Sequence, residues 1–260
     1  LGGVFGDELI VGSFIAFFSA PLIFSYISNL KEIKNFKSFY YVIFIVITFI
    51  SVLLSGERMA LIFYSLNLFI AIVIYFNLKL IILSFFSFSL ILIFLSNFND
   101  GVKNRYKNFI FQISALEKGN HIRLFSSAIN IWKENKYFGV GLKNYRVICD
   151  ETKFDYSTKM KTLCSTHPHN TIIEIIVETG LIGLILFFSF ILFYLAILRE
   201  RFSNLNIFSK PIFYGCLVVV IFYLWPIKSS GSFFSTNTAF IFWFYISICF
   251  LLTKKKHSSN

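Results

Sequence analysis

The chain has 260 residues, of which 57% are hydrophobic and only 14% charged, with 36 phenylalanines and a formal net charge of +11. Soluble domains are about 45–50% apolar and about 25% charged, so this composition, with a mean hydropathy of +0.73, excludes an ordinary soluble domain. Apolar runs close to the length that crosses about 30 Å of hydrocarbon recur along the chain. The sequence therefore predicts an all-α, polytopic transmembrane helical bundle.

In chain order, the apolar runs predict about seven spans. They lie at 9–28, 39–55, 59–76, 79–96, 171–198, 211–227 and 233–252. This divides the chain into residues 1–96 with four helices, 97–170 as one large, partly helical loop, and 171–260 with three helices and a basic tail. The opening LGGVFGDELIVGSF is typical of a loop that leads into a helix and lacks the basic start of a signal peptide. We therefore expect earlier spans to precede it in a longer protein.

Lysine and arginine in the short loops predict the orientation, because cytoplasmic loops carry an excess of these residues. One set of loops and the C-terminal tail hold Lys31, Lys34, Lys37, Lys79, Arg199, Arg201, Lys210, Lys254, Lys255 and Lys256. The opposite short loops hold only Arg58 and Lys228. We therefore expect the C-terminus to be cytoplasmic and the large loop to face outwards.

The large loop carries more Lys and Arg than Asp and Glu. Loops longer than about 60 residues cross a membrane largely regardless of charge, so this excess does not bear on the orientation. It indicates an outward surface for an anion, and a lipid phosphate or pyrophosphate fits that place better than a nucleic acid. A basic loop that is merely solvated beside anionic head groups is the alternative.

Part of the loop follows a helical period that begins at Gly119 or Asn120. Two sets of side chains recur on separate faces, the apolar Ile122, Phe125, Ile129 and Trp132, and the polar Arg123, Ser127 and Asn130. Such a helix would place Arg123 in its first turn, where unpaired backbone N–H groups favour a phosphate. Gly139-Val-Gly141 has no preceding strand and no third glycine, so we interpret it as a turn and not as a dinucleotide fingerprint.

The four cysteines divide by location. Cys216 and Cys249 lie in apolar spans and are interpreted as packing residues. Cys149 and Cys164 lie in the outward loop, where an oxidising compartment makes them a candidate disulfide. A metal site built from Cys164 and the nearby histidines is the competing interpretation, but it lacks a second cluster of ligands, and we predict no metal.

The polar motif STHPHN begins at residue 165 and leads into a long apolar helix. His167 and His169 flank Pro168, which favours an extended backbone in the residue before it. Asn170 stands at the N-cap position, because its side chain can accept from the first-turn N–H groups. A helix this apolar belongs in a membrane, so the histidines lie at a membrane–water boundary, where we expect the chemistry.

Charged side chains near the spans need a reason, because burying them in a membrane costs several kcal/mol. Glu174 and Glu178 share one face of the fifth predicted span. A helix over 171–198 would be about 42 Å long, so its first turns would rise above the bilayer, with Glu174 interfacial and Glu178 deeper. Arg58 lies at the outer end of the third span, where snorkelling is the simple alternative, and Glu57 beside it could be a plain surface partner.

Together these segments resemble the O-antigen ligase and O-antigen polymerase superfamily. HPHNTIIEIIVETGLIGLILFF resembles its HxHN segment, which closes a large periplasmic loop and leads into a helix with an ExGxxG pattern. SGER at 55–58 is similar to its Ser/Thr-Gly-x-Arg at an outer helix end. IRLFSSAINIWKENKYFGVGLKNY resembles its loop segment with an arginine, a tryptophan and an F-G-x-G turn, and FGDELIVGSF is similar to an earlier stretch. The family usually has more spans, so the chain resembles its C-terminal part.

The resemblance implies a metal-independent glycosyltransferase without a cofactor in the bacterial inner membrane, with the large loop in the periplasm. Its donor would be a glycan on undecaprenyl pyrophosphate, and its acceptor a sugar hydroxyl on lipid A-core or on another lipid-linked glycan. Arg58 and Arg123 would bind the pyrophosphate and stabilise its developing charge. His169 would take the acceptor proton as general base, and His167 would orient His169 or the acceptor.

Asn170, Glu174 and Glu178 are further candidates for contact with substrate, and Glu178 is interpreted first as a structural partner for an arginine or a backbone group. Ligase, polymerase and protein oligosaccharyltransferase share the motif residues, and we slightly prefer a polymerase because the Phe- and Lys-rich spans show no ligase-specific feature. A non-catalytic transporter or flippase of lipid-linked glycans is the alternative. It would place charges near the membrane midplane in discontinuous helices, whereas here they gather at one outer face. A non-enzymatic interaction protein would tolerate loss of His169.

Overall fold

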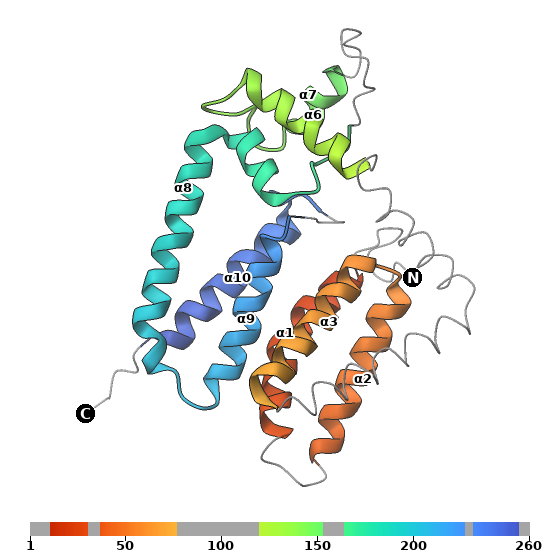
Figure 1. Cartoon of the computed structure of the whole chain (residues 1–260), viewed down its shortest axis with the longest axis vertical. Coiled ribbons are helices and arrows are strands. Elements are labelled where there is room, and N and C mark those ends of the chain that lie inside the picture. The colour runs from red at the N-terminus through yellow and green to blue at the C-terminus, as the bar shows by residue number, and fades with distance from the viewer. Residues whose placement is uncertain (1–10, 31–36, 77–119, 153–163, 227–230, 255–260) are drawn as a thin grey trace. The chain divides into compact units, whose positions relative to one another are not determined.

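The computed structural model describes residues 11–30, 37–76, 120–152, 164–226 and 231–254 (Figure 1). Every regular element in these ranges is helical. The elements are α1 (Val11–Leu30), α2 (Lys37–Ser55), α3 (Arg58–Tyr75), α6 (Asn120–Glu134), α7 (Tyr145–Thr152), α8 (Thr171–Arg201), the 3-10 helix η3 (Phe202–Asn204), α9 (Ser209–Tyr223) and α10 (Thr236–Thr253). The predicted all-helical class is confirmed for these ranges.

Four of the described helical segments are long and apolar enough to cross a membrane, namely Val11–Leu30, Arg58–Tyr75, Thr171–Asn204 and Thr236–Thr253. Two shorter apolar helices, Phe39–Ser55 and Ser209–Tyr223, accompany them. Each predicted span except 79–96 coincides with one of these helices, and 79–96 lies outside the described residues. The chain is therefore a multi-pass membrane protein, while the total of about seven spans stays a prediction.

The chain forms two compact units, and each is described by itself. The first unit is Leu1–Ile113 with Leu205–Val219, and the second is Ser114–Asn204 with Val220–Asn260. The division of the sequence into 1–96, 97–170 and 171–260 follows the order of spans and loop, and it stays a prediction.

In the first unit, α1 packs against both α2 and α3. Small residues permit this, since Ala16, Ala20 and Ala60 are fully buried. Gly215 of α9 lies close to α1, because a Cβ at this position would lie 2.5 Å from Cα of Pro21. Large side chains such as Phe24 and Tyr64 are buried beside these small residues.

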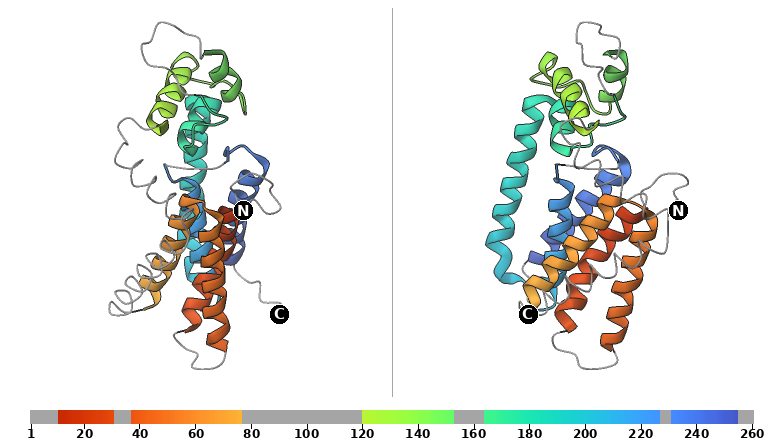
Figure 2. Two further views of the ribbon diagram at one scale, coloured as in Figure 1. Left: turned by 90° about the vertical axis from the view of Figure 1, so that its right-hand side faces the viewer. Right: turned by 45° about the vertical axis from the view of Figure 1, so that its right-hand side comes forward.

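In the second unit, α8 is broken at Gly180, whose φ of 69° and ψ of −170° lie outside the helical region. The helix α8 changes direction along its length, as two views show (Figures 1 and 2). The expected straight helix of about 42 Å is therefore wrong. The part of α8 after Gly180 measures about 31 Å at 1.5 Å per residue, which matches the hydrocarbon thickness of a bilayer.

The helix α6 forms where the sequence predicts a helix, but a different face of it is buried. Leu124, Ser127, Ala128 and Ile131 are buried, and of the predicted apolar face Ile122 is 47% exposed while Trp132 packs against the core. The two apolar sets overlap along the helix, and contact with α8 selects the set that contains the small Ala128. Ser127 can be buried because its hydroxyl donates to the Arg123 carbonyl at 2.9 Å.

Candidate functional site

The histidine pair lies directly before α8, with the two imidazole rings 4.1 Å apart between centroids. His169 Nε2 is 3.3 Å from Ser165 Oγ, and His167 Nδ1 is 3.0 Å from Thr166 Oγ1. His167 is buried and His169 is partly exposed. The pair therefore presents one accessible imidazole, His169, whose Nε2 already exchanges a hydrogen bond with a hydroxyl group.

The backbone of His169 is in the left-handed region, with φ of 58°. Among the described non-glycine residues only Lys143 shares a positive φ. Such a conformation costs about 1–3 kcal/mol and persists where the surroundings fix it, often at functional sites. The His169 ring is thus held in a direction that a relaxed extended chain would not give it.

Asn170 and Thr171 fix the histidine pair to the rest of the second unit. Asn170 is the N-cap of α8, because its Oδ1 accepts from the N–H groups of Ile172 at 2.9 Å and Ile173 at 3.0 Å. This confirms the predicted N-cap. Asn170 Nδ2 also donates to the Pro226 carbonyl at 2.9 Å, and the Thr171 hydroxyl donates to the Tyr223 carbonyl at 2.8 Å. Carbonyls at and beyond the end of α9, which lack a helical partner, are thereby satisfied.

The two glutamates of α8 are buried and bind other parts of the protein. The Glu174 carboxylate accepts from the Ser232 hydroxyl and, at 2.9 Å, from the Phe233 N–H, which holds the segment that leads into α10. Glu178 accepts from the Lys143 N–H at 2.7 Å, just before α7, where a negative charge is favourable beside a helix N-terminus. Both carboxylates therefore have structural partners, and their contact with a substrate stays a prediction.

The turn at 136–141 is joined to the break in α8. The pairs are Leu181 N–H to Lys136 O at 2.8 Å, Ile182 N–H to Tyr137 O at 3.2 Å, Val140 N–H to Val177 O at 2.9 Å, and Gly141 N–H to Glu178 O at 2.9 Å. These bonds satisfy backbone groups that would bond to each other in an unbroken helix. The sequence predicted the turn but gave no sign of its partner.

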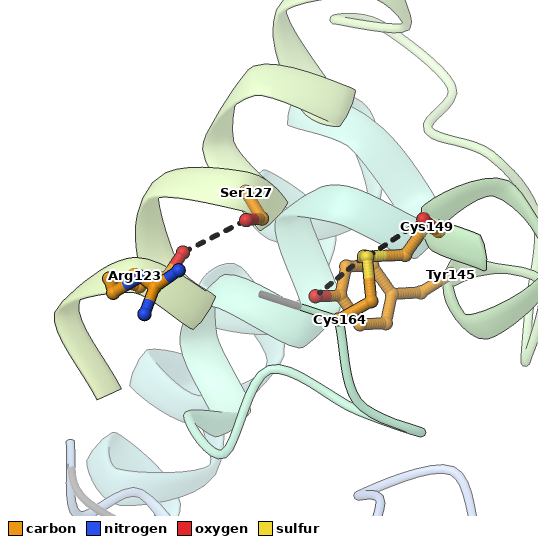
Figure 3. Close-up of a disulfide and its surroundings, with 5 residues drawn as sticks. All are labelled: Arg123, Ser127, Tyr145, Cys149 and Cys164. Carbon is orange, nitrogen blue, oxygen red and sulfur yellow. Dashed lines mark hydrogen bonds between the residues drawn. A yellow bond between two sulfur atoms is a disulfide. The ribbon is translucent and has the colours of Figure 1, made fainter. Parts of the chain in front are cut away.

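A disulfide joins α7 to the segment before the histidine pair. Cys149 and Cys164 are bonded with an S–S distance of 2.05 Å and a Cα–Cα distance of 5.7 Å (Figure 3). The hydroxyl of Tyr145 lies 3.6 Å from Cys149 Sγ, and burial raises the pKa of Tyr145 to about 12. With Cys164 in a disulfide, its sulfur is not a thiolate ligand for a metal. Within the described ranges no group of three or more His, Cys, Asp and Glu side chains could hold a metal ion.

The two arginines occupy corresponding places on their helices. Arg58 is the first residue of α3, and Arg123 lies in the first turn of α6, on the turn before Ser127 (Figure 3). The predicted location of Arg123 is therefore confirmed. Backbone N–H groups of a first turn and a guanidinium together favour a phosphate. Arg58 belongs to the first unit and Arg123 to the second, and their convergence on one ligand stays a prediction.

Glu57, beside Arg58, ties the loop before α3 to the start of α1. Its carboxylate accepts from the Gly12 N–H at 2.5 Å, the Ser13 N–H at 3.2 Å and the Ser13 hydroxyl at 2.6 Å. Glu57 is buried, so the interpretation of it as a surface partner is wrong. Burial raises the pKa of Glu57, and the hydrogen bonds from Ser13 and Gly12 oppose that rise. The SGER and FGDELIVGSF segments are therefore hydrogen-bonded to each other through Glu57.

Several helices long and apolar enough to cross a membrane, with a histidine pair at the start of one and arginines in the first turns of α3 and α6, define a multi-pass membrane protein. A family model described as O-antigen ligase matches residues 43–188, which is more than half of the chain. The chain belongs to the O-antigen ligase family. No curated protein matches it. The matched range includes SGER, α6 and the histidine pair, so the resemblance seen in the sequence is confirmed.

Proposed function

We propose that the protein is a bacterial inner-membrane glycosyltransferase that moves a glycan from undecaprenyl pyrophosphate to a sugar hydroxyl. The acceptor would be lipid A-core, as for a ligase, or another lipid-linked glycan, as for a polymerase. The proposal rests on membership of the O-antigen ligase family and, above all, on the partly exposed His169, whose ring lies 4.1 Å from that of the buried His167 directly before α8. In this proposal the large loop is periplasmic and the C-terminus cytoplasmic.

His169 is the proposed general base. Its accessible Nε2 would accept the proton of the acceptor hydroxyl while that oxygen attacks the anomeric carbon of the donor glycan. The bond from that carbon to the pyrophosphate oxygen breaks, and undecaprenyl pyrophosphate leaves as the anion. The proton on His169 is then released to water or to the leaving group. Contact with the His167 ring and the fixed backbone of His169 support this role, because they leave the base little reorganisation before reaction.

Arg58 and Arg123 are proposed to bind the pyrophosphate. Each guanidinium stays charged throughout the working pH range and can form paired hydrogen bonds to phosphate oxygens. Their placement in helical first turns adds partial positive charge from the backbone. Because arginines supply the stabilising charge, the proposed reaction proceeds without a metal, and we expect transfer to persist in the presence of a chelator.

The test uses the full-length protein in membranes with a donor glycan on undecaprenyl pyrophosphate. Wild type is compared with His169→Ala, Arg58→Ala and Arg123→Ala, and Arg146→Ala on the exposed side of α7 is the matched control. New glycan linkages are scored on gels with and without lipid A-core. Loss of transfer in the three variants but not in the control supports the proposal, and dependence on lipid A-core distinguishes ligase from polymerase.

Retained transfer in the variants is the result that speaks against the proposal. Wild-type transfer by all three variants, inserted in normal amounts, would contradict the assigned site. It would favour the alternative in which the protein moves lipid-linked glycans across the membrane without catalysis.

A further inference from the structure

The turn between α6 and α7 carries three large apolar side chains that project from the protein. Tyr137 is 67% exposed, Phe138 77% and Leu142 62%. Single exposed apolar residues are common on protein surfaces, but a local group of this size marks an interaction surface. We call Tyr137, Phe138 and Leu142 the apolar tip.

The apolar tip is fixed at the start of the membrane-spanning part of α8. The carbonyls of Lys136 and Tyr137 accept from the N–H groups of Leu181 and Ile182, at 2.8 and 3.2 Å. Both α8 residues expose their side chains, as do Ile185 and Leu186 one turn further on. Because this helix is long and apolar enough to span a membrane, its exposed apolar side chains face lipid.

The lipid-facing surface of α8 therefore continues onto the apolar tip. The Tyr137 carbonyl accepts from the Ile182 N–H, which lies in the first turn after the Gly180 break. The apolar tip is therefore bonded directly to this part of α8. In Figure 1 the turn between α6 and α7 lies beside the end of α8 at which the chain changes direction. A side chain at this level meets the boundary between head groups and acyl chains.

Charge and aromatic content of the same turn match that boundary. Lys133, Lys136 and Lys143 are exposed around the apolar tip. The Trp132 indole, which packs against the core of this unit, donates from Nε1 to the Lys136 carbonyl at 3.1 Å and so holds the turn in place. Aromatic rings at the head-group level with lysines reaching phosphates are typical of membrane interfaces.

We infer that the apolar tip inserts into the adjacent leaflet of the bilayer, with its lysines on phospholipid head groups. The occupant of this surface is bilayer lipid and not a protein partner. The insertion fixes the turn and, through the hydrogen bonds to α8, the break at Gly180 that follows the histidine-bearing segment. This adds a membrane anchor to a loop whose basic excess we interpret as a surface for an anion.

The test uses the full chain in lipid nanodiscs and measures quenching of tryptophan by brominated phospholipids. Phe138→Trp reports on the apolar tip, and Glu151→Trp, at an exposed acidic residue of α7, is the matched control. Quenching of the native Trp132, Trp225 and Trp243 is measured in the wild type and subtracted. Bromine is placed either near the head-group end or near the terminal methyl of the acyl chain.

The expected result is strong loss of the Phe138→Trp emission with bromine near the head groups, weaker loss with bromine near the methyl end, and none at Glu151→Trp. Tyr137→Trp repeats the measurement, so one misfolded variant does not end the test. Equal, weak quenching at positions 137, 138 and 151 would overturn the inference. So would an added indole that is shielded from aqueous iodide but untouched by brominated lipid, since a protein face would then cover the apolar tip.

Discussion

Gly139 and Gly180 lie backbone against backbone, each with a positive φ, of 68° and 69°. A Cβ at Gly139 would come within 2.5 Å of the Glu178 carbonyl carbon, and one at Gly180 within 2.2 Å of the Tyr137 oxygen. Neither position accepts a side chain, because both the conformation and the contact favour glycine. The F-G-x-G turn and the E-x-G of α8 are about 40 residues apart in the sequence, and their backbones pack directly against each other.

Gly139→Ala is expected to destabilise the protein more than Gly141→Ala. Both glycines have a positive φ, 68° and 95°, so both substitutions carry roughly 1–2 kcal/mol of backbone strain. At Gly141 the added Cβ meets only the Asn144 side chain at 3.9 Å, whereas at Gly139 the backbone of α8 must move. Thermal unfolding in detergent, compared between the two variants, measures the cost of the contact alone. Equal shifts in Tm would show that the joint tolerates displacement.

Glu57→Gln is expected to change how stability depends on pH. Burial raises the pKa of Glu57 in the folded protein above its ordinary value of 4.5. A raised folded pKa means that its contribution is complete below pH 4.5 and is lost as the pH rises through the folded pKa. Relative to the non-titrating Glu57→Gln, the wild-type Tm is therefore highest at acidic pH and falls as the pH rises through the folded pKa of Glu57. A difference that is constant with pH would contradict this assignment.

His169→Ala is expected to lower the rate of glycan transfer by about 10²–10⁴-fold, the range typical of a positioned general base. Ser165→Ala removes only the hydroxyl beside Nε2 and should cost much less. The measurement is the initial rate of transfer under saturating donor, with the amount of inserted protein normalised. Equal losses in the two variants would indicate that the segment matters for structure and that His169 has no special role.

The sequence predicted those features of the site whose signals are local. The N-cap at Asn170 and the helix around Arg123 depend on residues within one or two turns, and both are present. The break at Gly180 was missed, because the apolar pattern resumes at Leu181 and the groups that replace the lost helical bonds come from residues 136–141. Helical periodicity alone cannot show that a distant turn supplies those partners.

The carboxylates illustrate the same limit. Glu57, Glu174 and Glu178 each accept hydrogen bonds from backbone N–H groups more than 30 residues away in the chain. Charged residues at the ends of apolar runs indicate a special role. For Glu178 the predicted role was a structural partner such as a backbone group, and the Lys143 N–H confirms it. For Glu57 and Glu174 only the packed structure distinguishes surface pairing or substrate contact from a buried carboxylate that holds two segments together.

Reduction of the Cys149–Cys164 disulfide is expected to lower both stability and transfer. A bond that closes a segment of 15 residues contributes about 3 kcal/mol by restricting the unfolded chain. It also holds Cys164, the residue immediately before Ser165, so its loss loosens the partner of His169. The two other cysteines, Cys216 and Cys249, are buried free thiols. A reductant therefore has a single disulfide to break among the described residues.

The measurement compares Tm and transfer rate with and without reductant in wild type and in Cys164→Ser. Reductant should lower both quantities in the wild type and change neither in Cys164→Ser, which already lacks the bond. A wild type that keeps its Tm and rate after complete reduction, verified by thiol labelling, would show that α7 and the histidine segment are held by packing alone. In that case the buried cluster of Ala128, Ile131, Tyr145 and Val177 would carry the connection.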